Sequence, residues 1–247
     1  MPMHVGDQWK VACFLTSGTN INTTGAAFWP GQIVSNDVTE SEGYYNIRYA
    51  GTATRDTQQF VQGPRQISGK IKLNVQDFRF FKYALGSVLD TSGATNLHTF
   101  IATNNNDSCP EVGGDSLPAF NLEDSNSVLI GASGLNNIRT LNGCFVNNLT
   151  LSCAEGQPLM MDVDYVARTC NFTSGASSSV TESTVRPYLF SDLRLDLTAS
   201  GTATQNLKNV QLSIANNLDT PLYIDADRTI GTPIPTNRDY RMTATFN

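Results

Sequence analysis

The stretch FVNNLTLSCAEGQPLMMDVDYVARTC, residues 145–170, carries the clearest structural pattern in the chain. Apolar and polar residues alternate on both sides of AEGQP, a short segment rich in turn-forming residues. Alternation with a period of two is typical of a β-strand that buries one face. The stretch therefore predicts a β-hairpin.

Each strand of this hairpin is predicted to have one buried face and one outward face. The buried faces would carry Phe145, Asn147, Leu149, Leu151 and Cys153 in the first strand, and Met161, Val163, Tyr165 and Ala167 in the second. Asp162, Asp164, Arg168 and Cys170 would lie on the outward face of the second strand. Carboxylates two residues apart on a strand point the same way and can bind Ca²⁺ or act as acid and base. Outward acidic residues are more commonly only solvated, so we expect a polar surface rather than a metal site or a catalytic site.

The register of the hairpin also bears on the five cysteines, Cys13, Cys109, Cys144, Cys153 and Cys170. If Leu151 pairs with Val163, Cys144 lies opposite Cys170, at a separation that a disulfide can span. A Cys144–Cys170 disulfide is therefore possible. The simpler alternative is that the cysteines are buried free thiols, because the odd number and the absence of CxxC spacing indicate neither a zinc site nor a disulfide framework.

The segment DFRFFKYALG, residues 77–86, is the one helix that the sequence predicts clearly. Asp77 is a suitable N-cap, and Gly86 is suitable for the position just after the last turn. Phe78, Phe81 and Leu85 recur at helical spacing between them. We expect this apolar stripe to pack into the core.

The remaining sequence reads as strands joined by polar connections. Strands are predicted at residues 9–15, 44–51, 66–75, 117–124 and 237–247. The segment LSIANNLDTPLYI, residues 212–224, is predicted to form two strands joined by a turn. Long loops or insertions are expected at about 16–43, 52–64 and 90–140. We therefore predict a single all-β domain over residues 1–247, with one short helix and a sandwich-like or barrel-like sheet.

The composition narrows the possible functions. Charged residues make up 15% of the 247 residues, against roughly 25% in an ordinary soluble domain. A polar surface with few charges suits a protein that assembles, because charged side chains are depleted at interface cores, although an extracellular β-protein can have such a surface too. The net charge of -6 argues against high-affinity binding to nucleic acid, which needs a basic face.

The sequence offers no pattern for catalysis, for a cofactor or metal, or for a membrane. His4 and His98 are the only histidines, and neither lies near a nucleophile motif. We expect no catalytic, cofactor-binding or metal site. We also expect neither a standard export signal nor a membrane span, since no stretch approaches the ~20 apolar residues that a spanning helix needs.

Four blocks of sequence, taken in order, resemble the tail tube (major tail) proteins of tailed viruses of prokaryotes. They are GPRQISGKIKLNVQDFRFFKYALGS, LPAFNLED, GCFVNNLTLSCAEGQPLMMDVDYVA, and PYLFSDLRLDL followed by LKNVQLSIANNLDTPLYI and NRDYRMTATFN. They span about residues 63 to 247, and the polar insertions between them match poorly.

The resemblance implies a β-sandwich or barrel-like fold whose sheets join between subunits into the closed wall of a tube. It implies hexameric rings that stack into the conduit through which DNA leaves the virion. The implied partners are further copies of the chain, tail proteins such as the tape measure, the tail terminator and baseplate or tip components, and dsDNA that passes transiently without sequence-specific binding; no membrane is implied. The implied location is the tail of the virion, assembled in the host cytoplasm.

Under this resemblance the polar segment from Thr52 to Pro64 suits an arm that reaches the next ring. It lies between two predicted strands and lacks an apolar face, and ordering so long a loop in an isolated domain would cost backbone entropy for no gain. The residues that we expect to make the inter-ring contacts are Arg55, Asp56, Gln58, Gln59, Gln62 and Arg65. A mobile surface loop is the alternative.

Two other classes of protein share parts of the pattern. A ring protein from the tube of a contractile injection or secretion apparatus would have the same fold without the DNA. A secreted carbohydrate-binding β-sandwich would have the same strands, but it ordinarily needs an export signal and a cluster of exposed aromatic residues.

Overall fold

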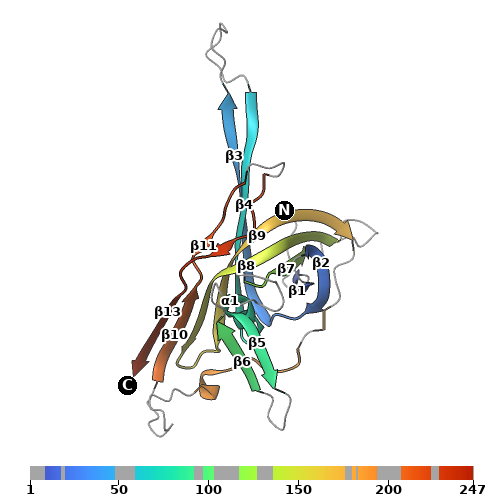
Figure 1. Cartoon of the computed structure of the whole chain (residues 1–247). Helices are drawn as coiled ribbons and strands as arrows, with labels where there is room; N and C mark the ends of the chain where they lie inside the picture. Colours follow the sequence, from blue (N-terminus) through green and yellow to red (C-terminus); the bar gives the residue numbers. More distant parts are fainter. Residues whose placement is uncertain are drawn as a thin grey trace.

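A computed structural model describes residues 9–17, 20–47, 59–91, 97–102, 117–126, 136–175, 180–181, 183–193, 207–223 and 228–246. Within these residues the protein is built almost entirely of antiparallel β-strands, with one short α-helix (Figure 1). One large sheet dominates the described part of the chain, and two small two-stranded ribbons accompany it. The predicted all-β class with a single short helix is confirmed.

The elements follow one another in this order: β1 (Trp9–Ser17), β2 (Asn20–Phe28), β3 (Gln32–Ile47), β4 (Gln59–Asn74), α1 (Arg79–Leu85), β5 (Gly86–Thr91), β6 (Leu97–Ala102), β7 (Phe120–Asn126), β8 (Asn136–Ala154), β9 (Met160–Gly175), the 3-10 turn η3 (Phe190–Asp192), β10 (Leu207–Ala215), β11 (Leu218–Asp219), β12 (Ile234–Pro235) and β13 (Asp239–Phe246). In the large sheet the strand order is β2-β1-β7-β8-β9-β4-β3. In addition, β10 pairs with β8, and β13 pairs with β10. The ribbons are β5–β6 and β11–β12.

Strand β8 is the centre of the sheet because it has different neighbours along its two halves. Its first half pairs with β7 and its second half with β10, while β9 pairs along nearly its whole length. The register against β9 shifts between Val146 and Asn148, close to the change of neighbour. An irregularity of this kind bends a strand and increases its twist. The part of the sheet around β7 and the part around β10 can therefore point in different directions and form different surfaces.

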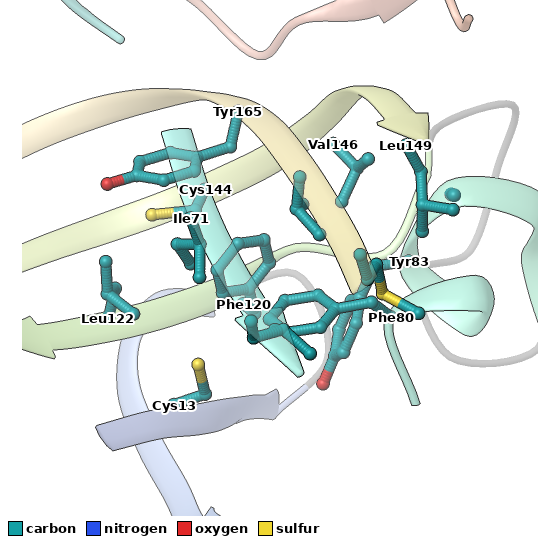
Figure 2. Packing of buried hydrophobic residues seen from close by; sticks show 14 of the residues in the cluster. Cys13, Ile71, Phe80, Tyr83, Phe120, Leu122, Cys144, Val146, Leu149 and Tyr165 are labelled. Atoms are coloured by element: carbon teal, nitrogen blue, oxygen red, sulfur yellow. The ribbon is translucent and has the colours of Figure 1, made fainter. Parts of the chain in front are cut away.

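The core lies where the sheet curls over itself and receives α1. Aromatic rings from three elements meet there: Phe80 of α1 lies 5.6 Å from Phe120 of β7, which lies 6.0 Å from Tyr165 of β9, measured between ring centroids (Figure 2). Ile71 and Leu122 are fully buried beside them. Apolar surface removed from water in this way is the main favourable term in folding.

Polar side chains close the open side of the curl, where β3 and β7 are not neighbours in the sheet. The Tyr165 hydroxyl donates to Asn36 Oδ1 at 3.1 Å, and Asn36 Nδ2 donates to Asp124 Oδ2 at 3.3 Å. Arg139 also donates to Asp124. Burial raises the pKa of Tyr165, so the phenol remains a neutral donor. Gly69 allows the tyrosine ring this position, because a Cβ atom there would lie 2.3 Å from the Tyr165 hydroxyl oxygen.

Two expectations about the flanking segments are wrong. Most of residues 16–43, expected to be a loop, forms β2 and the first part of β3. In LSIANNLDTPLYI, β10 does not pair with the residues that follow it; β10 pairs with β13, and β11 pairs with β12. The first predicted strand and the turn of segment 212–224 are found, but the strand after the turn is Leu218–Asp219 and not the apolar run that begins at Leu222. The expected strand at 117–124 is found as β7.

The helix begins and ends close to where the sequence predicts, but its buried face is different. It spans Arg79–Leu85, the Asp77 carboxylate accepts from the Arg79 backbone N–H at 3.1 Å, and Gly86 follows it with a φ of 116°. The fully buried aromatic side chain is Phe80, whereas Phe81 is only partly buried. The expected core stripe is thus right at Leu85, but Phe80 and Tyr83 supply the buried aromatic side chains, while Phe78 and Phe81 pack against the core only partly buried.

We expect Phe80→Ala to lower the free energy of unfolding by about 3–5 kcal/mol, because a large buried side chain leaves a cavity that the core cannot refill. Phe81→Ala, on the same helix, is the matched control and should cost clearly less, since Phe81 keeps part of its surface in water. Urea unfolding of the two variants would measure both values. Equal losses would contradict this assignment of the core face.

Candidate functional site

One face of the large sheet is polar across six neighbouring strands, and we call it the polar wall face. It consists of three rows of cross-strand neighbours running through β3, β4, β9, β8, β10 and β13. The rows are Asp37, Lys70, Asp164, Asn148, Ala215 and Asp239; Ser35, Lys72, Asp162, Thr150, Ser213 and Arg241; and Gln32, Asn74, Met160, Ser152, Gln211 and Thr243. None of these residues is buried. The opposite face of the same strands carries apolar rows that lead into the core, such as Leu73, Met161, Leu151, Leu212 and Met242.

Charges on the polar wall face nearly cancel. Lys70 Nζ lies 3.3 Å from Asp162 Oδ2 and 3.6 Å from Asp164 Oδ1, so one cation serves both carboxylates. Partial burial disfavours the charged lysine, but the two carboxylates outweigh this and raise the pKa of Lys70. Asn148 Nδ2 donates to Asp164 Oδ2 at 3.2 Å. The two aspartates thus belong to a partnered polar surface, as the outward-facing pattern predicted.

Arg168 does not share this open surface. Its side chain is partly buried, and Nε donates to the Ile230 carbonyl at 3.4 Å. The segment around Ile230 therefore lies over this part of β9. The pattern of alternation placed Arg168 on the right side of the strand, but it could not show that a distant segment lies over it.

The outer part of the β3–β4 hairpin, residues 40–47 and 59–66, projects away from the body of the molecule, and we call it the arm (Figure 1). In the part of the chain that the structure describes, its two strands pair with each other, and only at the base does Arg65 also form an isolated bridge with Thr229. Tyr44, Tyr45, Phe60 and Val61 are exposed near its outer end. Phe60 and Val61 belong to the segment from Thr52 to Pro64, which was expected to lack an apolar face. The described part of that segment therefore carries exposed apolar side chains. An isolated two-stranded hairpin is only marginally stable in water, so this arm suits a segment that is completed by a partner.

The predicted arm residues fall in three places. Gln59 and Gln62 are exposed on the arm. Arg65 lies at its base, where the guanidinium pairs with Glu40, approaches Glu42 Oε1 at 3.9 Å and donates to the Cys170 carbonyl at 3.2 Å. Arg65 therefore has partners within its own subunit. Arg55, Asp56 and Gln58 lie outside the described residues.

The Cys144–Cys170 disulfide is not formed. Cys144 pairs across the hairpin with Ala167, and Cys170 pairs with Leu141, so the two cysteines are not cross-strand neighbours. Both are free and buried, as are Cys13 and Cys153. Burial raises the pKa of Cys144 well above its ordinary value, which keeps the thiol protonated and unreactive. The prediction failed because it assumed a register in which Leu151 faces Val163, whereas Leu151 pairs with Met161.

Asn216 connects the polar wall face to the helix and to the last strand. This fully buried side chain donates to the Ala84 carbonyl of α1 at 3.0 Å and to the Val146 carbonyl of β8 at 2.9 Å. Arg238 Nε donates to Asn216 Oδ1 at 2.8 Å, just before β13 begins. The next residue, Asn217, has a φ of 46°, a left-handed conformation that asparagine tolerates better than most residues. The two neighbouring asparagines thus fix the turn that the sequence predicts within residues 212–224.

Within the described residues, no group of three or more His, Cys, Asp or Glu side chains is arranged to hold a metal ion. Among those residues there is also no helix of the length and hydropathy that crossing a membrane requires. The features that stand out are therefore extended surfaces: the polar wall face, the arm, and the exposed edges of β3 and β13.

We expect Asn216→Ala to lower the free energy of unfolding by about 2–4 kcal/mol, because it removes the amide that two buried carbonyls accept from and each lost buried hydrogen bond costs about 1–3 kcal/mol. Asn209→Ala is the matched control, since Asn209 is an exposed asparagine on β10. Thermal unfolding of both variants would measure the difference. A loss at Asn209 as large as that at Asn216 would contradict the role given to the buried amide.

Comparison with known proteins adds one finding. A family model described as "Phage tail tube protein" matches residues 16–246, nearly the whole chain. No curated protein sequence matches the chain.

Proposed function

We propose that this chain, which belongs to the phage tail tube protein family and is a structural subunit of the viral tail, has no enzymatic role. We propose further that its copies form hexameric rings that stack into a conduit for DNA. Family membership implies that the subunit assembles with itself and with other tail components. The observation that carries the finer proposal is the polar wall face, a broad and nearly neutral sheet surface with an edge strand, β3 or β13, at each side. The family match favours a virion over the tube of an injection or secretion apparatus.

Ring closure would use the two outer strands of the polar wall face. In the described residues, β3 pairs only with β4, and β13 pairs only with β10. Exposed edges of this kind invite pairing with another chain. Joining β13 of one copy to β3 of the next would continue the sheet around a ring and leave neither of these two edges free, as in a closed barrel.

In such a ring the polar wall face would line the lumen, since its reverse side is apolar and leads into the core. The lining would carry Lys70, Lys72 and Arg241 against Asp37, Asp162, Asp164 and Asp239. A strongly basic lining would hold DNA, because neutralising phosphates releases counterions. A balanced lining contacts DNA without retaining it, which suits transient passage without sequence-specific binding.

The arm would reach along the tube from one ring to the next. It lies at one end of the molecule and projects beyond every other described element (Figure 1). The further partners that we propose are the tape measure, the tail terminator and baseplate or tip proteins, which would meet the first and last rings. Assembly would take place in the host cytoplasm.

Shortening the arm tests the stacking role. Replacing residues 44–62 with Asn-Gly, a sequence that favours a tight hairpin turn, removes no buried hydrophobic side chain among the described residues of that segment. We expect a nearly unchanged melting temperature and rings without long tubes in negative-stain electron microscopy, whereas the parent chain forms tubes of uniform diameter. Long tubes from the shortened chain would contradict the stacking role, and a parent chain that stays monomeric at high concentration would contradict the proposed function as a whole.

Changing the charge of the polar wall face tests the lumen assignment. Gln32 and Gln211 are exposed residues of its third row. In virions assembled with Gln32→Lys/Gln211→Lys subunits, we expect tails to form but DNA release to slow, and to slow less as salt increases, because the added cations bind phosphates. Gln32→Glu/Gln211→Glu is the matched control and should release DNA at the parent rate. Parent-like release from both variants would show that this face does not line the conduit.

A further inference from the structure

The end of the molecule opposite the arm carries a second exposed apolar surface. Four side chains around η3 form it, and we call them the receiving strip: Val185, Tyr188, Leu189 and Phe190. Between 38% and 60% of each side chain is exposed. In Figure 1 the orange turn η3 lies at the lower end of the molecule, whereas the arm extends from the upper end. Exposed apolar groups gathered in one short segment indicate an interaction surface.

The receiving strip is held in place by its own backbone rather than lying loosely on the surface. The Tyr188 N–H donates to the Val75 carbonyl at 2.9 Å, and the Leu159 N–H donates to the Tyr188 carbonyl at 2.8 Å. The Phe190 N–H donates to the Gln157 carbonyl at 3.1 Å. The Tyr188 ring also packs against Phe78, 5.4 Å away between centroids. A partner would therefore meet a preformed surface and would not have to order it on binding.

The two charged residues beside the receiving strip, Arg186 and Asp192, pair with each other. Arg186 Nη1 and Nη2 donate to the two carboxylate oxygens of Asp192 at 2.6 and 2.8 Å, and Asp192 also accepts from the Leu189 N–H at 2.9 Å. These bonds lower the pKa of Asp192 to about 2, so the pair remains ionised and matched at neutral pH. The strip thus presents apolar side chains beside a satisfied ion pair, which favours an uncharged partner.

The outer end of the arm has the matching chemistry. Its exposed side chains, which we call the arm tip, are Tyr44, Tyr45, Phe60 and Val61. Residues 43–47 and 59–63 include no charged residue. Phe60 is 67% exposed, an unusually large apolar surface to leave in water on a two-stranded hairpin.

From these observations we infer that the receiving strip is the docking site for the arm tip of a second copy of this chain, in the adjacent ring. Copies related by a shift along the tube bring opposite ends of the molecule together, so a head-to-tail contact must join two different surfaces. The arm tip and the receiving strip are both apolar, lie at opposite ends, and carry no unmatched charge. This inference rests on the proposed function, to which it adds the surface that the arm contacts.

A charge-swap experiment tests the pairing in the full-length chain. Phe190→Asp and Phe60→Lys, each alone, place one charge against an apolar surface. Each should weaken ring stacking by about tenfold or more, the loss expected when a buried interface aromatic is removed. Both variants should still form rings with the parent melting temperature. The chain that carries both substitutions should recover long tubes in negative-stain electron microscopy, and this recovery should fade at high salt because the new contact is an ion pair.

Leu222→Asp is the matched control, because Leu222 is 48% exposed and Phe190 is 49% exposed, but Leu222 lies outside both surfaces. It should stack like the parent. Parent-like tubes from Phe190→Asp, shortening by Leu222→Asp as strong as that by Phe190→Asp, or a double variant that is not rescued would each overturn the pairing. In all three cases the parent chain still forms tubes, so the proposed function would stand. A parent chain without rings or tubes would instead overturn the proposed function.

Discussion

The structure depends on the change of partner along β8, which is held in place by one buried amide. The first half of β8 belongs with β7 to the curled core, and the second half belongs with β10 to the polar wall face. Asn216 lies where these halves meet and bonds the helix, β8 and the approach to β13 together. Buried polar groups are costly unless they are fully bonded, so this one side chain fixes a single arrangement of three elements.

That arrangement gives one sheet two tasks. Its apolar rows supply the core and so stabilise the subunit, while its polar rows form a broad surface that is nearly neutral. Low charge is compatible with this because the positive and negative charges on the surface nearly cancel, and Lys70 pairs with both Asp162 and Asp164. A chain that assembles edge to edge also gains from having few unmatched charges, since burying one at a contact is expensive. The low content of charged residues and the nearly neutral sheet surface therefore have the same physical cause, the cost of burying an unmatched charge.

Assembly also explains features that would be liabilities in a solitary domain. A hairpin that projects into solvent, aromatic side chains at its outer end, and the sheet edges at β3 and β13 all expose groups that are more stable when covered. In a stack of rings each of them would find a partner. The fold positions them separately, with edges at the sides and apolar surfaces at the two ends, so that lateral and axial contacts do not compete.

The sequence by itself determined the class of the fold, the helix near Asp77 and the outward aspartates of β9, because period-two alternation and capping residues are local signals. Its resemblance to a tail tube subunit came separately, from four ordered blocks of sequence. It could not determine the strand order, the register between β8 and β9, or the partner of β10, since these depend on residues far apart in the chain. The Cys144–Cys170 disulfide prediction failed for that reason. The first part of β3 was missed because none of its residues is fully buried, so its sequence shows no clean alternation of apolar and polar residues. Only the tertiary structure showed Phe80 as the core aromatic, Asn216 as the link between elements, and the arm as an apolar projection.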